Sequence, residues 1–367
     1  MRRRLRASGL IAGAAIVLVA AFAGAASLRT DTSKALVPLD DIVAGGPPPD
    51  GIPAIDRPAF VTPAAAAAWL TPKEPVLGLD INGDARAYPL QILMWHEIVN
   101  DAVGSTRVVV TYCPLCNSGL VFERSIAGRT LDFGTSGQLY KSDLVMYDRQ
   151  THSLWSQMDG RAIVGELAGT QLTVIPANTI SFEEWRAAHQ AGKVLSRETG
   201  HSRRYGVNPY TAYDQPLQSP LLFTGRPDPR RPPKERVVGV KVGGVARAYP
   251  WSLLERRGVI HDRLESETLV VFHQQGALSA LDESEIRRSR AVGATAVFSR
   301  QLDGRVLTFV AAGARFRDQE TGSIWTLPGR AVDGPLAGCR LRAIPHVDAF
   351  WFAWAAFNPA TSLAGGE

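Results

Sequence analysis

Two cysteines separated by two residues are the part of this 367-residue chain best suited to chemistry. The motif Cys113-Pro-Leu-Cys116 has three possible uses. The spacing lets the two sulfurs bond to each other, so the pair can alternate between a dithiol and a disulfide. The two thiolates can instead bind one metal ion, copper or zinc. A permanent disulfide that only stabilises the fold is the third use.

The residues around the pair separate it from the best-known sites of its kind. In thioredoxin-like proteins the first cysteine begins a helix, which lowers the thiol pKa, whereas here residues 117–119 lead into a predicted strand. A structural zinc site needs four ligands, and the chain has no second Cys-x-x-Cys. His96 and His152 could complete one. We expect redox chemistry in which Cys113 attacks and Cys116 resolves. Metal binding and a structural disulfide remain the alternatives, and the cofactor stays open between none, copper and zinc.

His96 is the candidate catalytic base, or a third ligand beside Cys113 and Cys116 if the site holds metal. Residues 96–100, His-Glu-Ile-Val-Asn, match half of a His-Glu-x-x-His zinc helix. Because asparagine stands at the second histidine position, we do not expect a zinc protease. A histidine at a helix end that bonds to backbone is the competing interpretation. Cys339, the third cysteine, is predicted to be a buried, inert thiol.

The chain repeats itself once. Residues 76–89 (VLGLDINGDARAYP) recur as residues 237–250 (VVGVKVGGVARAYP), at an offset of 161 residues. Residues 148–155 (DRQTHSLW) then match residues 318–325 (DQETGSIW), at an offset of 170. One long unit present twice indicates a duplication, since the short units of a solenoid recur several times.

The duplication divides the chain into five predicted parts. They are a signal peptide or N-terminal anchor (1–25), an N-terminal extension (26–75), a first copy with the cysteine site (76–195), a linker that packs across both copies (196–236) and a second, degenerate copy (237–359).

Each copy has mainly the pattern of β-strands. Asn82-Gly83 between two apolar runs predicts a hairpin. Residues 90–100 are apolar with helical spacing, and Ser181 followed by two glutamates predicts a short helix over 181–190. We therefore expect an α+β fold, predominantly antiparallel, with a small barrel or sandwich in each of two tandem copies.

Three differences between the copies favour the first as the working one. Only the first copy has His-Glu at 96–97, the cysteine motif at 113–119 and a loop about six residues longer at 135–143. We expect these three segments to converge on one cleft, with the linker residues 205–213 as a wall.

The net charge of +5 comes mostly from four arginines, Arg2, Arg3, Arg4 and Arg6. Without them the chain is nearly balanced, so nucleic-acid binding has no electrostatic support. The arginines precede an uncharged run over residues 10–26, the pattern of a secretory signal or an uncleaved anchor. We expect an exported protein, either periplasmic or anchored outside the cytoplasmic membrane. It should touch the membrane only through this segment. Its substrate or redox partner is unknown. Disulfides persist in such compartments.

Four motifs together resemble the bacterial family catalogued as domain of unknown function 3179, some members of which are described as selenoproteins. The motifs lie at 95–101, 111–119, 142–148 and 154–157, and the resemblance extends over residues 76–359. The family supplies no settled activity. Selenocysteine in the cysteine motif would imply nucleophilic or redox chemistry at that motif.

Overall fold

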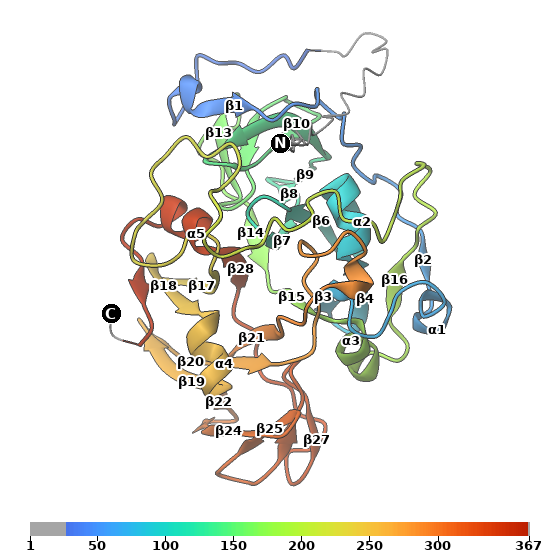
Figure 1. The fold of residues 1–367 in the computed structure, drawn as a ribbon, viewed down its shortest axis with the longest axis vertical. Coiled ribbons are helices and arrows are strands. Elements are labelled where there is room, and N and C mark those ends of the chain that lie inside the picture. The colour runs from blue at the N-terminus through green and yellow to red at the C-terminus, as the bar shows by residue number, and fades with distance from the viewer. Residues whose placement is uncertain (1–26, 366–367) are drawn as a thin grey trace, which may run out of the picture.

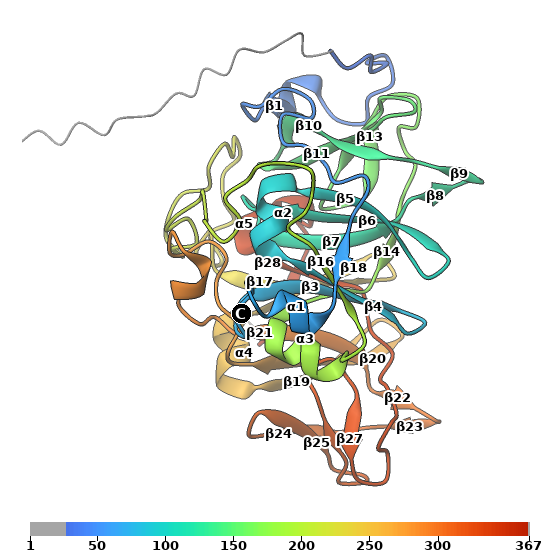
Figure 2. The ribbon, with the colours of Figure 1, turned by 90° about the vertical axis from the view of Figure 1, so that its right-hand side faces the viewer.

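Short strands, mostly antiparallel, are the main secondary structure of the computed structural model, which describes residues 27–365 (Figures 1 and 2). The predicted α+β class with predominantly antiparallel pairing is therefore confirmed. The predicted signal peptide or anchor at 1–25 lies outside the described residues. Within 27–365, no helix has the length and apolar character needed to cross a bilayer.

Three sheets and one ribbon precede the linker. The first sheet has the order β1 (Ile42–Ala44), β10 (Phe133–Tyr140), β11 (Asp143–Asp148), β12 (Leu154–Ser156), β13 (Arg161–Val164). The second has the order β14 (Thr173–Ile175), β7 (Ser118–Glu123), β6 (Thr106–Cys113), β5 (Ile98–Val103). The third has the order β15 (Asn178–Ser181), β3 (Pro75–Ile81), β4 (Asp84–Pro89), β16 (Lys193–Leu195), β2 (Phe60–Val61). The ribbon pairs β8 (Ser125–Ile126) with β9 (Arg129–Thr130).

The elements after the linker follow a similar order. One sheet runs β28 (His346–Phe350), β17 (Arg236–Val242), β18 (Val245–Pro250), β29 (Ser362–Leu363). A second runs β19 (Val259–Leu264), β20 (Glu267–Gln274), β21 (Ala294–Ser299). A third runs β24 (Phe309–Ala312), β25 (Arg315–Asp318), β26 (Ile324–Trp325), β27 (Ala331–Asp333), and the ribbon pairs β22 (Gln301–Leu302) with β23 (Arg305–Val306).

The helices are short and connect or cover the sheets. They are α1 (Pro63–Ala66), α2 (Leu90–His96), α3 (Phe182–Ala188), α4 (Trp251–Arg257) and α5 (Trp351–Phe357), with 3₁₀ turns η1 (Leu39–Asp41) and η2 (Ile286–Arg288). The predicted start of α3 is confirmed, because the Ser181 side chain accepts a hydrogen bond from the Glu184 backbone N–H. Figure 1 shows the β10–β13 sheet at one end of the molecule and the β24–β27 sheet at the other.

The hairpin predicted at Asn82-Gly83 forms, and its geometry explains the sequence. Both residues have positive φ, 52° and 91°, as do Gly243 and Gly244 in the equivalent hairpin, at 57° and 88°. Two-residue turns that match the twist of the strands need positive φ at both positions, which asparagine and glycine adopt most easily.

The same side-chain contacts occur at matching positions of the two repeated segments. Asp148 accepts from the Trp155 indole at 2.9 Å, and Asp318 accepts from the Trp325 indole at 2.8 Å. These contacts agree with a duplication, but the division into two tandem copies remains a prediction. The two halves are interleaved, since β15 packs on β21 and β28 packs on β7.

Two predictions about local structure are wrong. The helical pattern over 90–100 ends early: α2 stops at His96, Glu97 takes a left-handed conformation at φ 58°, and β5 begins at Ile98. β-branched Ile98 and Val99 pair with β6, which fixes them in a strand. Cys339 is half-buried rather than buried, because it sits in the turn after β27.

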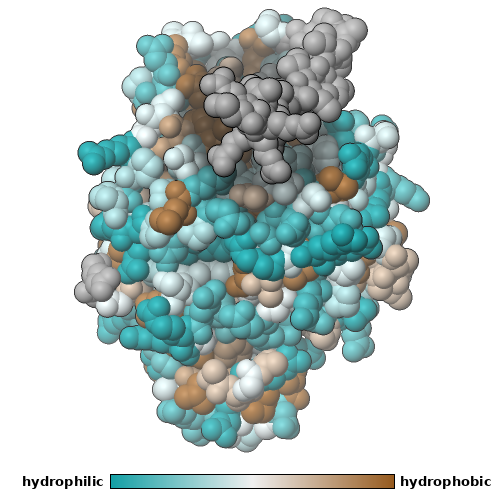
Figure 3. Space-filling view, viewed as in Figure 1, coloured by the Kyte–Doolittle hydropathy of each residue, from teal (hydrophilic) through white to brown (hydrophobic). Residues whose placement is uncertain are grey.

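The predicted linker, 196–236, covers the segment that connects β16 to β17. It accepts a hydrogen bond from the Trp95 indole at Val207 O, and the Asn208 backbone N–H donates to Ser284 O at 2.8 Å. The surface in Figure 3 is mostly hydrophilic across its middle, with hydrophobic residues in small groups, as is usual for a protein surface.

Candidate functional site

Cys113 and Cys116 lie in the tight connection between β6 and β7. β6 ends at Cys113, and its partner across the hairpin, Ser118, begins β7. Asn117 closes the connection in a left-handed conformation at φ 52°. Both thiols are free and buried, with exposures of 2 % and 0 %. The predicted pair is thus built by a strand-to-strand turn, with no helix behind the first sulfur.

Asp143 joins the two thiols from a different hairpin. It begins β11 directly after the two-residue turn Lys141-Ser142, in which both residues have positive φ, 55° and 66°. Neither is glycine, so this turn depends on contacts that hold it. The Ser142 hydroxyl donates to Leu221 O at 2.6 Å, and the Lys141 ammonium donates to Ala356 O at 2.8 Å. The hairpin is therefore anchored by residues distant in sequence.

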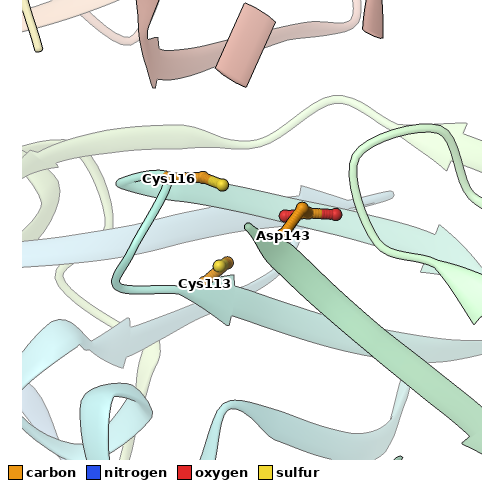
Figure 4. Close-up of side chains that lie close together, drawn as sticks. All are labelled: Cys113, Cys116 and Asp143. Carbon is orange, nitrogen blue, oxygen red and sulfur yellow. The ribbon is translucent and has the colours of Figure 1, made fainter. Parts of the chain in front are cut away.

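The three side chains project into one small space (Figure 4). Both sulfurs and a carboxylate oxygen of Asp143 lie within 4.8 Å of one another. The Met158 backbone N–H donates to Asp143 Oδ2 at 2.8 Å, whereas Oδ1 is buried and has no hydrogen-bond partner among residues 27–365. The Ser142 carbonyl oxygen is 3.4 Å from the Cys116 sulfur.

A cavity of about 100 Å³ opens beside Cys113. Its wall includes Glu97, Thr135, Gln138 and Tyr210. The three segments that distinguish the first copy therefore do meet, and the linker contributes Tyr210, as expected. Glu97 lines this cavity; its neighbour His96 does not.

Burial dominates the electrostatics of the site. It raises the pKa of Glu97 to about 8, with a further contribution from the Asp143 carboxylate, and the pKa of Asp143 to about 7. Burial likewise raises the pKa of both thiols, Cys113 and Cys116. Within the part of the chain that the structure describes, these four groups form no ion pair with a basic side chain. The site thus favours protonated thiols, the opposite of a thiol activated by nearby positive charge.

His96 is held by other partners. Its Nδ1 lies 2.7 Å from Pro53 O, and its Nε2 lies 2.6 Å from the Tyr205 hydroxyl. Burial lowers the pKa of His96 to about 4, so the ring is neutral at pH 7. It is not part of the group formed by Cys113, Cys116 and Asp143. A catalytic or ligand role for His96 remains a prediction. The second histidine considered, His152, accepts at Nδ1 from the Arg29 backbone N–H.

Glu97 and Asp143 were not among the predicted site residues, although the sequence carried a sign of both. Gly258 stands at the position of Glu97 in the second repeated segment, and Asp143 lies at the end of the loop that is longer in the first. The comparison that selected His96 therefore applied equally to its neighbour. Spacing alone did not show which of the two side chains turns toward the sulfurs.

The stability of the reduced, metal-free protein should depend on Glu97 as pH rises. Below its unfolded pKa, near 4.5, Glu97 is protonated in both states and does not lower the free energy of unfolding. As pH rises from there toward about 8, the unfolded chain releases this proton while the folded protein keeps it, so the free energy of unfolding falls. Glu97→Gln should match the wild type near pH 4 and be more stable by about 3 kcal/mol at pH 7. Urea unfolding between pH 4 and 8 measures this, with the exposed Glu255→Gln as control. Parallel curves for Glu97→Gln and wild type would refute the prediction.

A family model described as a protein of unknown function (DUF3179) matches residues 49–361, which is most of the chain. No curated protein and no solved structure matches this chain.

Proposed function

Because the chain belongs to the DUF3179 family, whose function is unknown, its activity has to be inferred from its own site, and we propose thiol–disulfide exchange at Cys113 and Cys116. The observation that carries this proposal is the unequal access to the two sulfurs. Cys113 lines the cavity, whereas Cys116 has 0 % exposure and lies outside the cavity wall. An attacking sulfur must reach a substrate and a resolving sulfur need not.

In the proposed reaction, the Cys113 sulfur attacks one sulfur of a substrate disulfide and forms a mixed disulfide. The other substrate sulfur leaves and takes the Cys113 proton. Cys116 then gives its proton to the Asp143 carboxylate and attacks the Cys113 sulfur, and the second substrate sulfur leaves as a thiolate. Asp143 returns its proton to this thiolate, so the protein dithiol is oxidised to a disulfide and the substrate disulfide is reduced to two thiols. Asp143 suits the role of proton acceptor, because a pKa of about 7 leaves it partly ionised at neutral pH.

The burial of the two thiols also bears on whether the pair oxidises or reduces its substrate. Strong disulfide oxidants, with potentials near −120 mV, owe their strength to a stabilised reduced form, as when a thiol pKa is lowered. Burial raises the pKa of both Cys113 and Cys116, so their thiolates gain no such stabilisation. We therefore propose that the pair acts as a reductant, closer to the thioredoxin value of about −270 mV.

A redox titration tests the proposal. With mild reduction followed by iodoacetamide, Cys113 and Cys116 should be alkylated together, and both should be lost in one transition between about −300 and −200 mV. Cys339→Ser should leave this transition unchanged, and Cys113→Ser should abolish it. A midpoint below about −300 mV, with a large loss of stability on reduction, would contradict exchange chemistry and indicate a structural disulfide.

Metal binding is the second candidate, and the compact ligand group favours it. Two sulfurs and a carboxylate oxygen within 4.8 Å of one another could hold zinc or copper, and the unpartnered Asp143 Oδ1 would gain a partner. Metal analysis of the same preparations separates the candidates, because both use the same sulfurs. One tightly bound ion per wild-type chain and per Cys339→Ser chain, absent from Cys113→Ser, would replace the redox proposal.

Export belongs to the proposal as well. The arginine-led apolar segment within residues 1–26 supports a location outside the cytoplasmic membrane, as a periplasmic or membrane-anchored protein. The redox partner or substrate would then be a disulfide-bearing molecule of that compartment.

A further inference from the structure

The cavity beside Cys113 is small for a binding site. Its volume is about 100 Å³, whereas pockets for drug-sized ligands have about 300–1,000 Å³ and an apolar cavity of about 150 Å³ holds benzene. Cys113 is only 2 % exposed, so a disulfide must enter this cavity for one of its sulfurs to reach the thiol. The space therefore admits a sulfur with one short arm, but not a cystine flanked by peptide chains.

The wall that the linker contributes is held in place. The Tyr210 backbone N–H donates to the Asn208 side-chain oxygen at 2.7 Å. Asn208 is 2 % exposed, and its own backbone N–H and side-chain amide donate to Ser284 O at 2.8 Å and Glu283 O at 3.2 Å. Tyr210 is thus tied to the second half of the chain, and a larger substrate would have to break these hydrogen bonds to widen the cavity.

The charge of the lining restricts the substrate further. In the part of the chain that the structure describes, no lysine, arginine or histidine lines this cavity, while Glu97 does and is 8 % exposed. Burial raises the pKa of the Cys113 thiol most, and the Asp143 and Glu97 carboxylates raise it further, so both acids act at its sulfur. An anionic arm would leave water without a cation to pair with, whereas a cationic arm could pair with Glu97.

The rest of the lining suits a short hydrocarbon arm with a polar end. Thr135, Gln138 and Tyr210 are its polar uncharged side chains. Aliphatic side chains cover much of the remainder, namely Ile52, Leu115, Leu139 and Leu144. Methylene groups of a substrate would pack against these side chains at no cost in unpaired polar groups.

We infer that the substrate of this site is a small disulfide with short arms that are uncharged or cationic. The inference rests on the proposed function, because it names the substrate that the Cys113 sulfur attacks. It excludes a protein disulfide by volume and a small anionic disulfide by charge.

Four disulfides test the inference on the reduced full-length protein. Three have two-carbon arms that differ in their end group: 2-hydroxyethyl disulfide, cystamine and 3,3′-dithiodipropionate. The fourth, N,N′-diacetyl-L-cystine bis(methylamide), is an uncharged mimic of cystine within a peptide. Each rate of protein oxidation, followed by intact mass, is divided by the rate of the same disulfide with dithiothreitol to correct for intrinsic reactivity. Compared with 2-hydroxyethyl disulfide, cystamine should react at least as fast, whereas dithiodipropionate and the cystine mimic should each react about 100-fold more slowly.

Two variants with matched controls locate the charge selection. Glu97→Gln should lower the rate of cystamine relative to 2-hydroxyethyl disulfide about fivefold, and the exposed Glu255→Gln should not. Gln138→Lys places a cation on the wall and should raise the relative rate of dithiodipropionate about tenfold. Gln301→Lys, on the exposed strand β22, should leave that relative rate unchanged.

The outcomes separate this inference from the exchange chemistry itself. If the wild type reacts with all four disulfides at similar corrected rates, the substrate class is wrong and the exchange chemistry stands. If none of the four oxidises the wild type while dithiothreitol reacts normally, the exchange chemistry is wrong as well. Should Gln138→Lys fail to fold, the wild-type series and the Glu97 pair decide. In that case, a corrected rate for dithiodipropionate or the cystine mimic equal to that of 2-hydroxyethyl disulfide, or equal effects of Glu97→Gln and Glu255→Gln, refutes the inference.

Discussion

Asp143→Asn should slow the second step of disulfide exchange about 100-fold at pH 7, while the first step changes little. In the proposed reaction the Cys116 thiol must lose its proton before it attacks, and the Asp143 carboxylate lies within 4.8 Å of both sulfurs. Asparagine keeps the shape and cannot accept the proton. A positioned base typically contributes about 10²- to 10⁴-fold to such a step.

Acid quenching and intact-mass measurement resolve the two steps, with 2-hydroxyethyl disulfide as a small substrate. The wild type should pass quickly from the dithiol to the internal disulfide. Asp143→Asn should accumulate the mixed disulfide on Cys113, as Cys116→Ser should do permanently. The exposed Asp40→Asn is the control. If Asp143→Asn closes its internal disulfide at the wild-type rate, Asp143 is not the proton acceptor.

The difference between the predicted and observed site has a physical origin in the two hairpins. The Cys-x-x-Cys spacing is local, so the sequence was enough to predict that the sulfurs could meet. Asp143 comes from a different hairpin, β10–β11, whose register is shifted between Thr135 and Gln138. Gly137 lies in that shift at φ 74°, where an added Cβ would stand 2.0 Å from Pro47 O. Such a contact between distant segments leaves no periodic pattern in the sequence.

The neighbours His96 and Glu97 show the same limit at the scale of one residue. Both fall at the end of a helical pattern, and the α2 terminus could have turned either side chain toward Cys113. The left-handed conformation of Glu97 decides it, together with the hydrogen bonds that hold His96 to Pro53 and Tyr205. The partner Tyr205 is 109 residues away along the chain, in the linker.

The strand content was easier to predict, since hairpin turns and alternating apolar residues are local signals. The Asn82-Gly83 hairpin and the antiparallel class both follow from them. The interleaving of the halves does not. The Phe350 backbone N–H donates to Cys116 O at 2.9 Å, so the second half supports the turn that carries the site. A second repeated segment without cysteines in its matching turn can still be needed for the thiol chemistry.

Arg86→Ala should lower the free energy of unfolding by about 4 kcal/mol, because it would leave a buried carboxylate without its cation. Arg86 donates to both Asp101 oxygens at 2.7 Å, and the Tyr88 hydroxyl donates to one of them at 2.6 Å. The side chains of Arg86 and Asp101 are only 11 % and 6 % exposed. Once the guanidinium is removed, Asp101 keeps the tyrosine hydroxyl but loses its counter-charge.

The repeated sequence supplies the matched control for that experiment. Arg247 and Asp262 make the same contact with Tyr249, but their side chains are 28 % and 19 % exposed. Water can solvate Asp262 after Arg247→Ala, so that loss should be about 1 kcal/mol. Urea denaturation with equal m-values compares the two variants directly. Equal losses would mean that burial does not set the cost. β4 and β5, which hold Arg86 and Asp101, are joined by α2 and Glu97. A larger loss for Arg86→Ala would therefore mean that this buried ion pair also fixes the two strands between which Glu97 is held.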